Sequence, residues 1–367
     1  MRPMPDDLAI APPSSCDAAV AAASEHAPSG PLPPRDGLAA LERARGSAAR
    51  YRRASRSEAT WRAYASDWRI FEAWCSGRSL EALPASADTL VAFLAAEADR
   101  GRAPSTLQRR IAAVRLVHLG AGAEPPHRSI AVAELMRGIR RTVGGAPAKK
   151  APALDAEVRA MVDALDLGRT AGLRDRALLL VGFAGALRRS EIAAMRFEDL
   201  ERRPEGVLVS IPRSKGDRDA LGQSVAVPAR PGSRHCPVAA LDAWAARAGI
   251  ATGAVFRKVS RAGRVGPAAL APASVSEVVK RAASRVEGLD PARYSAHSLR
   301  HGLLTSAARR GGADVFRLRA HSRHASLQTL LEYVEDGEAF ERHAADGLLE
   351  DDGRPDGARA GGAPEDA

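Results

Sequence analysis

The side chains best suited to chemistry in this sequence lie between residues 297 and 333. The run His297-Ser298-Leu299-Arg300-His301 is followed by Arg323-His324 and, nine residues after His324 (333 − 324), by Tyr333. A guanidinium grips a phosphate with two parallel hydrogen bonds, imidazoles donate or relay protons, and a phenol oxygen can attack as a nucleophile. The spacing therefore predicts phosphoryl transfer through a covalent phosphotyrosine, with no metal ion. Only four tyrosines occur in the chain, so few residues compete with Tyr333 for this role.

Two further segments carry charged residues that suit the same reaction. Glu191 follows Arg188 by three residues, and Lys215 lies between two strand-like apolar runs, 207–211 and 224–227, that indicate a hairpin. Only five of the 54 basic residues are lysines, and a lysine can release a proton that an arginine retains, so Lys215 is a candidate proton donor. Two alternatives stay open: Glu191 forms only a helix ion pair, and Lys215 is an ordinary turn residue.

Composition narrows the class of protein. The 367 residues suffice for two domains, and the net charge of +10 with a pI near 10.2 indicates a polyanionic partner, most often nucleic acid. The longest apolar run, 177–187, is too short to span a bilayer, and the Ala-rich stretch 18–23 makes a poor signal peptide. The three cysteines lack paired spacing, which excludes a disulfide framework or a usual zinc site. We expect a reduced, cytoplasmic protein without a cofactor.

The first half of the chain predicts a tail followed by an all-α domain. Residues 1–54 are rich in Ala, Pro, Ser and Gly and predict a disordered tail with a basic end, either solvated or touching DNA. A capping-box pattern at 55–58 opens an aromatic stripe at helical spacing, which we interpret as core. Three more amphipathic stretches follow, so residues 55–143 form four helices. Their surface is predicted to be basic, with Arg102, Arg109, Arg110, Arg115, Arg137, Arg140 and Arg141.

A linker and a second domain complete the organisation. Residues 144–152, rich in Gly, Ala, Pro and Lys, predict a flexible basic linker. The domain at 153–349 contains helices, with the hairpin around Lys215 as its predicted β structure, and the stretch 350–367 predicts a disordered tail. The fold class is therefore mainly α with a small β-hairpin or sheet in the second domain.

Together these motifs resemble those of the tyrosine recombinases, the phage integrase family, of the Xer-like kind. The likeness covers roughly residues 55–345. The family's Gly-x-x-Arg-x-x-Glu stretch is similar to Gly185-Ala186-Leu187-Arg188-Arg189-Ser190-Glu191, and its hairpin lysine is similar to Lys215. Its His-x-x-Arg box resembles residues 297–300, from His297 to Arg300. The spacing between its last histidine and its nucleophile resembles that between His324 and Tyr333. The resemblance implies a SAM-like core-binding domain joined to a catalytic domain, which together clamp double-stranded DNA.

The resemblance also implies a role for each residue. Arg188 and Arg300 neutralise charge on the phosphate, Tyr333 attacks it, and Lys215 protonates the leaving 5′-hydroxyl. His297 and His324 hydrogen-bond the phosphate and help to transfer protons, with Glu191 in support. His301 and His321 are expected to be structural. Recombination of two sites implies a homotetramer on DNA and a monomer in solution. Residues 334–349 are expected to dock on a neighbouring copy. Accessory factors that bend DNA or set the direction of the reaction are compatible with this assembly.

The sequence departs from the family's motifs at one position, and two other functions compete with that of a recombinase. The family most often has Leu-Gly-His where this chain has Ser322-Arg323-His324, so Arg323 adds bulk and charge where a glycine is usual. This leaves the local backbone geometry and the role of His324 open. A type IB topoisomerase uses nearly the same residues to relax supercoils, although the small helical domain and the basic linker favour a recombinase. A catalytically silent DNA-binding relative would not need the complete residue set.

Overall fold

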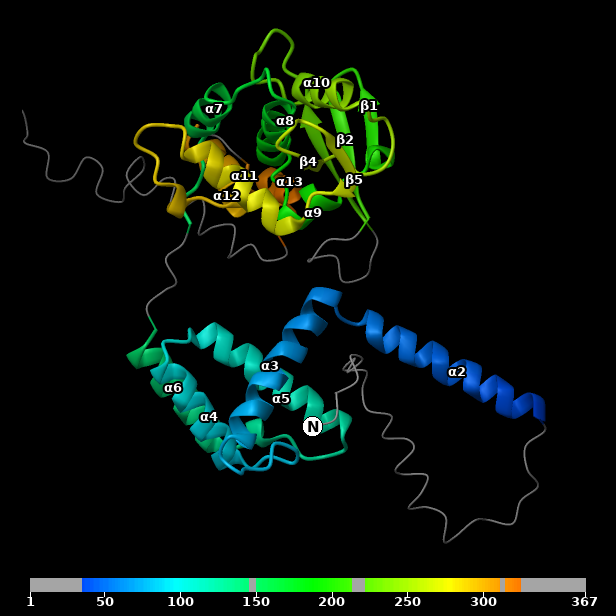
Figure 1. Ribbon diagram of the computed structural model, residues 1–367, viewed down its shortest axis with the longest axis vertical. Helices are drawn as coiled ribbons and strands as arrows, with labels where there is room; N and C mark the ends of the chain where they lie inside the picture. The colour runs from blue at the N-terminus through cyan, green and yellow to red at the C-terminus, as the bar shows by residue number, and fades with distance from the viewer. Residues whose placement is uncertain (1–34, 145–149, 213–221, 311–313, 325–367) are drawn as a thin grey trace, which may run out of the picture. The chain divides into compact units, whose positions relative to one another are not determined.

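The computed structural model describes residues 35–144, 150–212, 222–310 and 314–324 (Figure 1). The chain divides between Pro147 and Ala148 into two compact units, and each has its own apolar core. Both units are mainly helical, and the second also contains small antiparallel sheets, as the sequence predicts. Within the described ranges, no helix is long and apolar enough to cross a membrane.

Residues 35–54 form helix α2 (Arg35–Ala54), so the prediction of disorder through residue 54 is wrong for this stretch. Ala and Arg dominate it, and these residues favour a helix without needing an apolar partner face. From residue 39 to 54 nearly every side chain is exposed. A search for apolar periodicity therefore could not find this helix. The predicted disorder of residues 1–34 falls outside the described residues.

The first unit, Met1–Pro147, is called the helical unit below. It contains the four predicted helices, with a short 3₁₀ turn before the last. They are α3 (Glu58–Ser76), α4 (Ala87–Asp99), α5 (Pro104–Gly120) and α6 (Ile130–Thr142). The capping residue of α3 is Ser57, whose side chain accepts a hydrogen bond from the Thr60 amide at 3.2 Å, rather than Ser55. Phe71 is fully buried and packs edge-on against Phe93, with ring centroids 5.0 Å apart, so the aromatic stripe is core.

Two arginines of the predicted basic surface are instead engaged in ion pairs. Arg110 is buried and bonds the buried carboxylate of Glu97. Arg109 clasps the buried carboxylate of Asp67 with two bonds of 2.7 and 3.1 Å. The prediction that Arg110 lies on the surface is wrong because its acidic partners come from other helices, which the sequence of α5 does not reveal.

The second unit, Ala148–Ala367, begins with helices and then a three-stranded sheet. The helices are α7 (Asp155–Asp163), α8 (Thr170–Ala184) and α9 (Arg189–Ala194), and the strands are β1 (Leu200–Arg203), β2 (Gly206–Ile211) and β3 (Gln223–Pro228). After the sheet come α10 (Pro237–Ala248), β4 (Arg257–Val259), β5 (Val265–Ala269), α11 (Pro272–Ala283), α12 (Ala296–Arg309) and α13 (Val315–Ser322).

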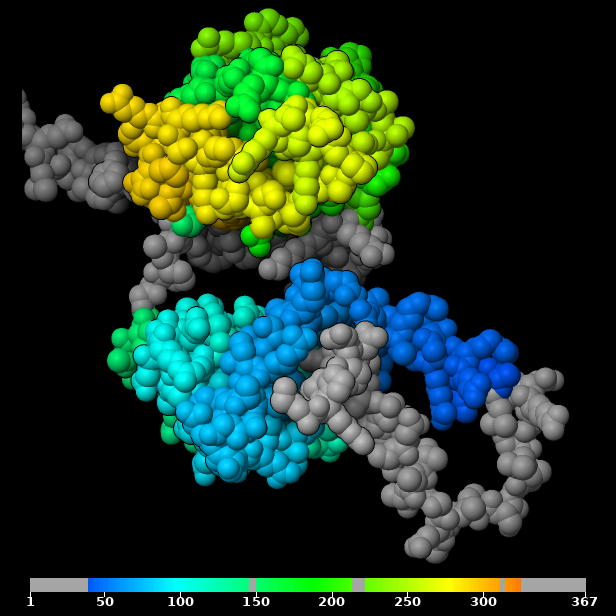
Figure 2. Space-filling view, viewed as in Figure 1, coloured from blue at the N-terminus to red at the C-terminus, as the bar shows by residue number. Residues whose placement is uncertain are grey.

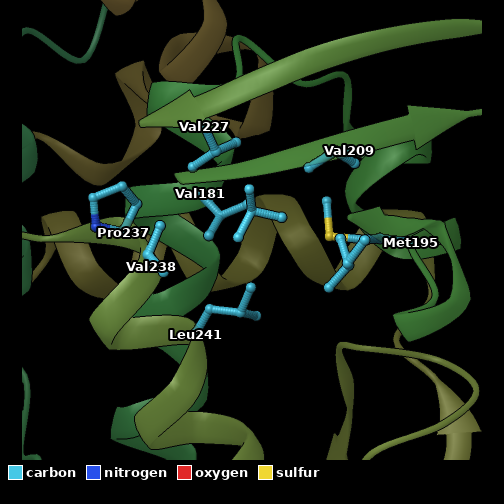
Figure 3. Close-up of a pocket in the computed structure, with 9 residues that line it drawn as sticks. Val181, Met195, Val209, Val227, Pro237, Val238 and Leu241 are labelled. Carbon is cyan, nitrogen blue, oxygen red and sulfur yellow. The ribbon is translucent and has the colours of Figure 1, made fainter. Parts of the chain in front are cut away.

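The predicted hairpin is confirmed as the antiparallel pair β2–β3, in which Ile211 opposes Gln223. Strand β1 was not predicted, because its Leu-Glu-Arg-Arg sequence is polar. The separate β4–β5 pair was not predicted either, because β5 contains Gly and Pro. Figure 3 shows Val209 and Val227 of the sheet above Val181 of α8 and Leu241 of α10. These apolar contacts fix the sheet on the helices and provide no group for chemistry.

The chain enters the second unit along the start of α12. The Lys150 ammonium donates to the carbonyl of Ala292 at 2.6 Å, and the Ala151 and Ala153 amides donate to the Arg293 and Ser298 carbonyls, each at 2.9 Å. The end of the predicted linker 144–152 is therefore fixed to this unit, while residues 145–149 lie outside the described part. On α12, a Cβ at Gly302 would lie 1.7 Å from the Ala153 carbonyl oxygen, so only glycine permits this close approach.

Candidate active site

The turn between α8 and α9 positions the first predicted arginine. Ala186 lies in the left-handed region with φ 45°, and Arg188 is the N-cap residue of α9. The Arg188 amide donates to Oε2 of Glu191 at 2.8 Å, and its Nη1 donates to Oε1 at 2.7 Å. The Glu191 side chain is only 3% exposed, whereas that of Arg188 is 22% exposed. Glu191 therefore caps the helix and holds the guanidinium at the edge of the solvent.

Helix α12 brings the second arginine to the same turn. The Ser295 side chain caps this helix, and the exposed His297 lies in its first turn. Arg300, one turn later, is 2% exposed, and its Nη1 donates to the Ala186 carbonyl at 2.7 Å. A non-glycine residue in the left-handed region is strained by about 1 kcal/mol or more, and here that conformation presents a carbonyl to Arg300. One strained turn thus holds both predicted arginines.

Helix α13 ends beside these groups. Its last residues lead into Arg323, which is left-handed with φ 58° and ψ 43°, and whose carbonyl accepts from Nη2 of Arg188 at 3.1 Å. His324 follows, with its Nδ1 at 2.8 Å from the Ser322 hydroxyl. His321 instead donates from Nε2 to the Ala184 carbonyl at 2.8 Å and fastens α13 to the end of α8. This contact suits a structural role for His321 and leaves His324 as the imidazole that the end of α13 supplies to the site.

The charges of the site act on both imidazoles. Burial, followed by the fields of Arg300 and Arg188, lowers the pKa of His324 to about 3. Partial burial of its ring, followed by the fields of Arg300 and Arg188, also lowers the pKa of His297, although the residue as a whole remains exposed. Both rings are therefore neutral at neutral pH in the protein without DNA. The contact between the Ser322 hydroxyl and Nδ1 fixes the orientation of the His324 ring.

Arg323 is the residue whose importance the sequence analysis missed. Its side chain is 3% exposed, and its Nη2 donates to Oε2 of Glu191 at 2.8 Å. Its Nη1 donates to the His321 carbonyl at 3.2 Å. The left-handed backbone explains why a glycine would be at ease at this position. The available signal was the departure from Leu-Gly-His itself, but nothing in the local sequence indicates that the side chain turns inward to Glu191.

An open hollow of about 620 Å³ lies next to His324, and its lining comes from β3 and α13, with Gln223, Ser224, Phe316, Arg319, Ala320, Arg323 and His324. The segment with Lys215 connects β2 to β3, and the segment with Tyr333 follows His324. Both Lys215 and Tyr333 lie outside the described residues. Gln223, at the start of β3, and His324, after α13, line the same hollow.

The structure therefore brings four of the six predicted catalytic residues to one place, Arg188, His297, Arg300 and His324, with Glu191 beneath them. These side chains come from α9, α12 and the end of α13. Among the described residues, no three His, Cys, Asp or Glu side chains are grouped so that they could hold a metal ion. The cluster offers two guanidiniums and two neutral imidazoles, a set that suits an anionic phosphodiester.

Comparison with known proteins agrees with this arrangement. Residues 154–339 match the phage integrase family, and residues 51–124 match the phage integrase N-terminal SAM-like domain. An integrase/recombinase xerD homolog of Selenomonas ruminantium is 36% identical over 230 residues, which cover 62% of this chain and 67% of the relative. Recombinase cre of Escherichia phage P1 is 31% identical over 166 residues, which cover 43% of this chain and about half (48%) of that relative.

A solved structure shares the fold. The integrase of the Tn1549 transposon, in complex with transposon right end DNA, superposes with a TM-score of 0.53 at 13% identity. The superposition covers 77% of this chain and 91% of that one. The family match spans more than half of the present sequence and contains every element that builds the cluster described above. The chain therefore belongs to the phage integrase family, the tyrosine recombinases.

Proposed function

We propose that this chain is a site-specific recombinase that cuts and rejoins duplex DNA through a 3′-phosphotyrosyl intermediate, without a metal ion or ATP. The observation that carries the proposal is the convergence of Arg188 and Arg300 on one strained turn, with His297 and His324 beside them. Two guanidiniums can neutralise a phosphodiester from two sides, and the two neutral imidazoles can donate hydrogen bonds to its oxygens.

The proposed reaction follows from these groups. The Tyr333 oxygen attacks the scissile phosphorus and forms a phosphotyrosine ester, its phenol proton passes to one of the two neutral imidazoles, and the bond to the 5′-oxygen breaks. Arg188 and Arg300 stabilise the charge that develops on the non-bridging oxygens. The leaving 5′-oxygen takes a proton from Lys215, which an arginine could not supply. Attack by a second 5′-hydroxyl reverses these steps and releases Tyr333, so the ester conserves the energy of the broken bond.

Duplex DNA is the proposed partner. The net charge of +10 suits a polyanion, and the Tn1549 integrase with the same fold was solved in complex with transposon end DNA. Exchange between two duplexes requires four strand cleavages, and each copy of the chain supplies one Tyr333. We therefore propose a homotetramer on two recombining sites and a monomer in solution. Phosphate contacts would supply much of the affinity, which should fall as salt rises.

Covalent trapping on DNA tests the proposal. DNA recovered as an adduct from cells is sequenced, and a nicked suicide duplex with the recovered site is then incubated with purified protein. We expect wild type to form an adduct with or without EDTA, and Tyr333→Phe to bind the duplex and form none. Tyr51→Phe, the same change at a tyrosine that is 69% exposed on α2, serves as the control and should react normally. An adduct with Tyr333→Phe, or a strict need for a divalent cation, would contradict the mechanism.

A further inference from the structure

Glu191 is shared by two arginines from distant parts of the chain. Oε1 accepts from Nη1 of Arg188 at 2.7 Å, and Oε2 accepts from Nη2 of Arg323 at 2.8 Å. A carboxylate paired with a single guanidinium has no net charge, whereas this cluster of two guanidiniums and one carboxylate carries one net positive charge. The second arginine therefore changes the electrostatics of the cluster in addition to its packing.

Burial indicates which of the two arginines carries the surplus charge. The side chains of Arg323 and Glu191 are each 3% exposed, and they form the buried pair. The Arg188 side chain is 22% exposed and lies at the open edge of the cluster. Buried charges are tolerated when they are paired and hydrogen-bonded, which describes Glu191 with Arg323. The unbalanced charge is thus that of Arg188, the group expected to meet the phosphate.

The backbone of Arg323 supports a selected role for its side chain. It lies in the left-handed region with φ 58°, where glycine is free of strain and any other residue is not. Its carbonyl, which every residue possesses, already accepts from Nη2 of Arg188 at 3.1 Å. A glycine would keep that bond and relieve the backbone. The arginine side chain must therefore contribute something that the backbone alone does not. It donates to the carbonyls of His321 and Ala186 at 3.2 and 3.5 Å, and its ion pair with Glu191 at 2.8 Å is the contact that joins two charges.

We propose that Arg323 is a positioning residue that neutralises Glu191, so that Glu191 can orient Arg188 without cancelling its charge toward the scissile phosphate. The inference rests on the proposed function, because it assigns the phosphate to Arg188. It explains why a buried arginine stands where glycine would fit the backbone. It also predicts that removing Arg323 harms cleavage less if the charge of Glu191 is removed at the same time.

Four variants test this through the charge at Glu191. Arg323→Met keeps the left-handed strain and much of the bulk but removes the charge, and Arg323→Lys keeps the charge. Glu191→Gln with Arg323→Met restores the net charge of the cluster. Arg174→Met is the matched control, since Arg174 is also buried and paired, with Asp175 at 2.6 Å, and lies ten residues before Ala184 on α8. Each protein is first compared with wild type by circular dichroism and thermal unfolding.

The main readout is the single-turnover rate of adduct formation on the suicide duplex, measured beside the affinity for the same duplex. We expect Arg323→Met to react roughly tenfold or more slowly with little change in affinity, and Arg323→Lys to retain most of the rate. The double variant should recover most of the loss, and Arg174→Met should react like wild type. Normal cleavage by Arg323→Met, or a double variant as slow as Arg323→Met, would overturn the proposal in favour of a packing role.

A second readout separates this inference from the proposed function. Inorganic phosphate is titrated into the same proteins without DNA, and the rise in unfolding temperature reports its binding. We expect the rise to shrink in Arg323→Met and to return in the double variant. If wild type forms no covalent adduct, the proposed function fails, yet the phosphate series still decides the role of Arg323. An unchanged phosphate response in Arg323→Met would refute that role even if cleavage is observed.

Discussion

Replacing Gly302 with alanine should destabilise the catalytic unit, although alanine normally stabilises a helix. Gly302 lies on α12, two residues after Arg300, and a Cβ there would be 1.7 Å from the Ala153 carbonyl oxygen and 2.3 Å from its carbon. Both atoms belong to the backbone, so the segment entering the unit must move away from α12. That movement would break the hydrogen bond from the Ala153 amide to the Ser298 carbonyl, now 2.9 Å long.

The expected magnitude follows from three opposing effects. Forcing a methyl group against a packed backbone costs about 1–3 kcal/mol. Loss of the Ala153 hydrogen bond costs about 1 kcal/mol, whereas the better helix propensity of alanine returns about 1 kcal/mol. The free energy of unfolding should therefore fall by about 2 kcal/mol. For a domain of this size, that corresponds to a decrease in unfolding temperature of roughly 4–8 °C.

Thermal unfolding of the whole protein, followed by calorimetry, measures this change. Gly138→Ala on α6 is the matched control, because a Cβ at Gly138 would meet nothing within 4 Å. That control should be neutral or stabilising by up to about 1 kcal/mol. The displaced start of α12 should also slow adduct formation by Gly302→Ala. An unfolding temperature equal to that of wild type would show that the approach of Ala153 to α12 does not require glycine.

Three further predictions concern the site and the helical unit. Arg300→Lys keeps the charge but loses the forked geometry, so cleavage should drop by roughly two orders of magnitude with DNA binding retained, and near-normal cleavage would argue against the paired guanidiniums. Lys215→Ala should be slow on an ordinary phosphodiester and recover on one with a 5′-bridging sulfur, which leaves without a proton, and lack of recovery would assign the proton to another group. Burial lowers the pKa of His118, whose ring accepts a hydrogen bond from the Ala85 amide and bonds the Val114 carbonyl. Below about pH 6.5 the unfolded chain therefore binds more protons than the folded protein. The unfolding temperature should therefore fall as pH drops from 8 through 6.5 to 5.5. His118→Gln should reduce this pH dependence in the helical unit, and an equal pH dependence in the variant would show that His118 does not cause it.

Local patterns predicted those parts of the fold that depend on near neighbours. Aromatic spacing placed Phe71 in a core, and alternation identified β2 and β3. Spacing along α9 and α12 also located Arg188 and Arg300, because each belongs to a short motif. Helix α2 was missed for the opposite reason, since its residues favour a helix through propensity and its side chains from residue 39 onward are nearly all exposed.

Long-range ion pairs account for what the sequence could not reveal. Arg323 turns inward because Glu191, 132 residues earlier, offers a carboxylate oxygen. Arg110 is buried for the same kind of reason, with Glu97 on a neighbouring helix. In both cases an arginine that would ordinarily be solvated gains a partner only after the helices have packed. Counting basic residues therefore overestimates the surface available to phosphates.

The hydrogen bonds that Ala151 and Ala153 make at the start of α12 join backbone to backbone. The Ala151 and Ala153 amides donate to carbonyls on either side of His297, at Arg293 and Ser298. The position of the first turn of α12, and with it that of His297, therefore depends on the path of this entering segment whatever side chains the segment carries. A change in that backbone path would reach the site even though none of these residues supplies a group to it.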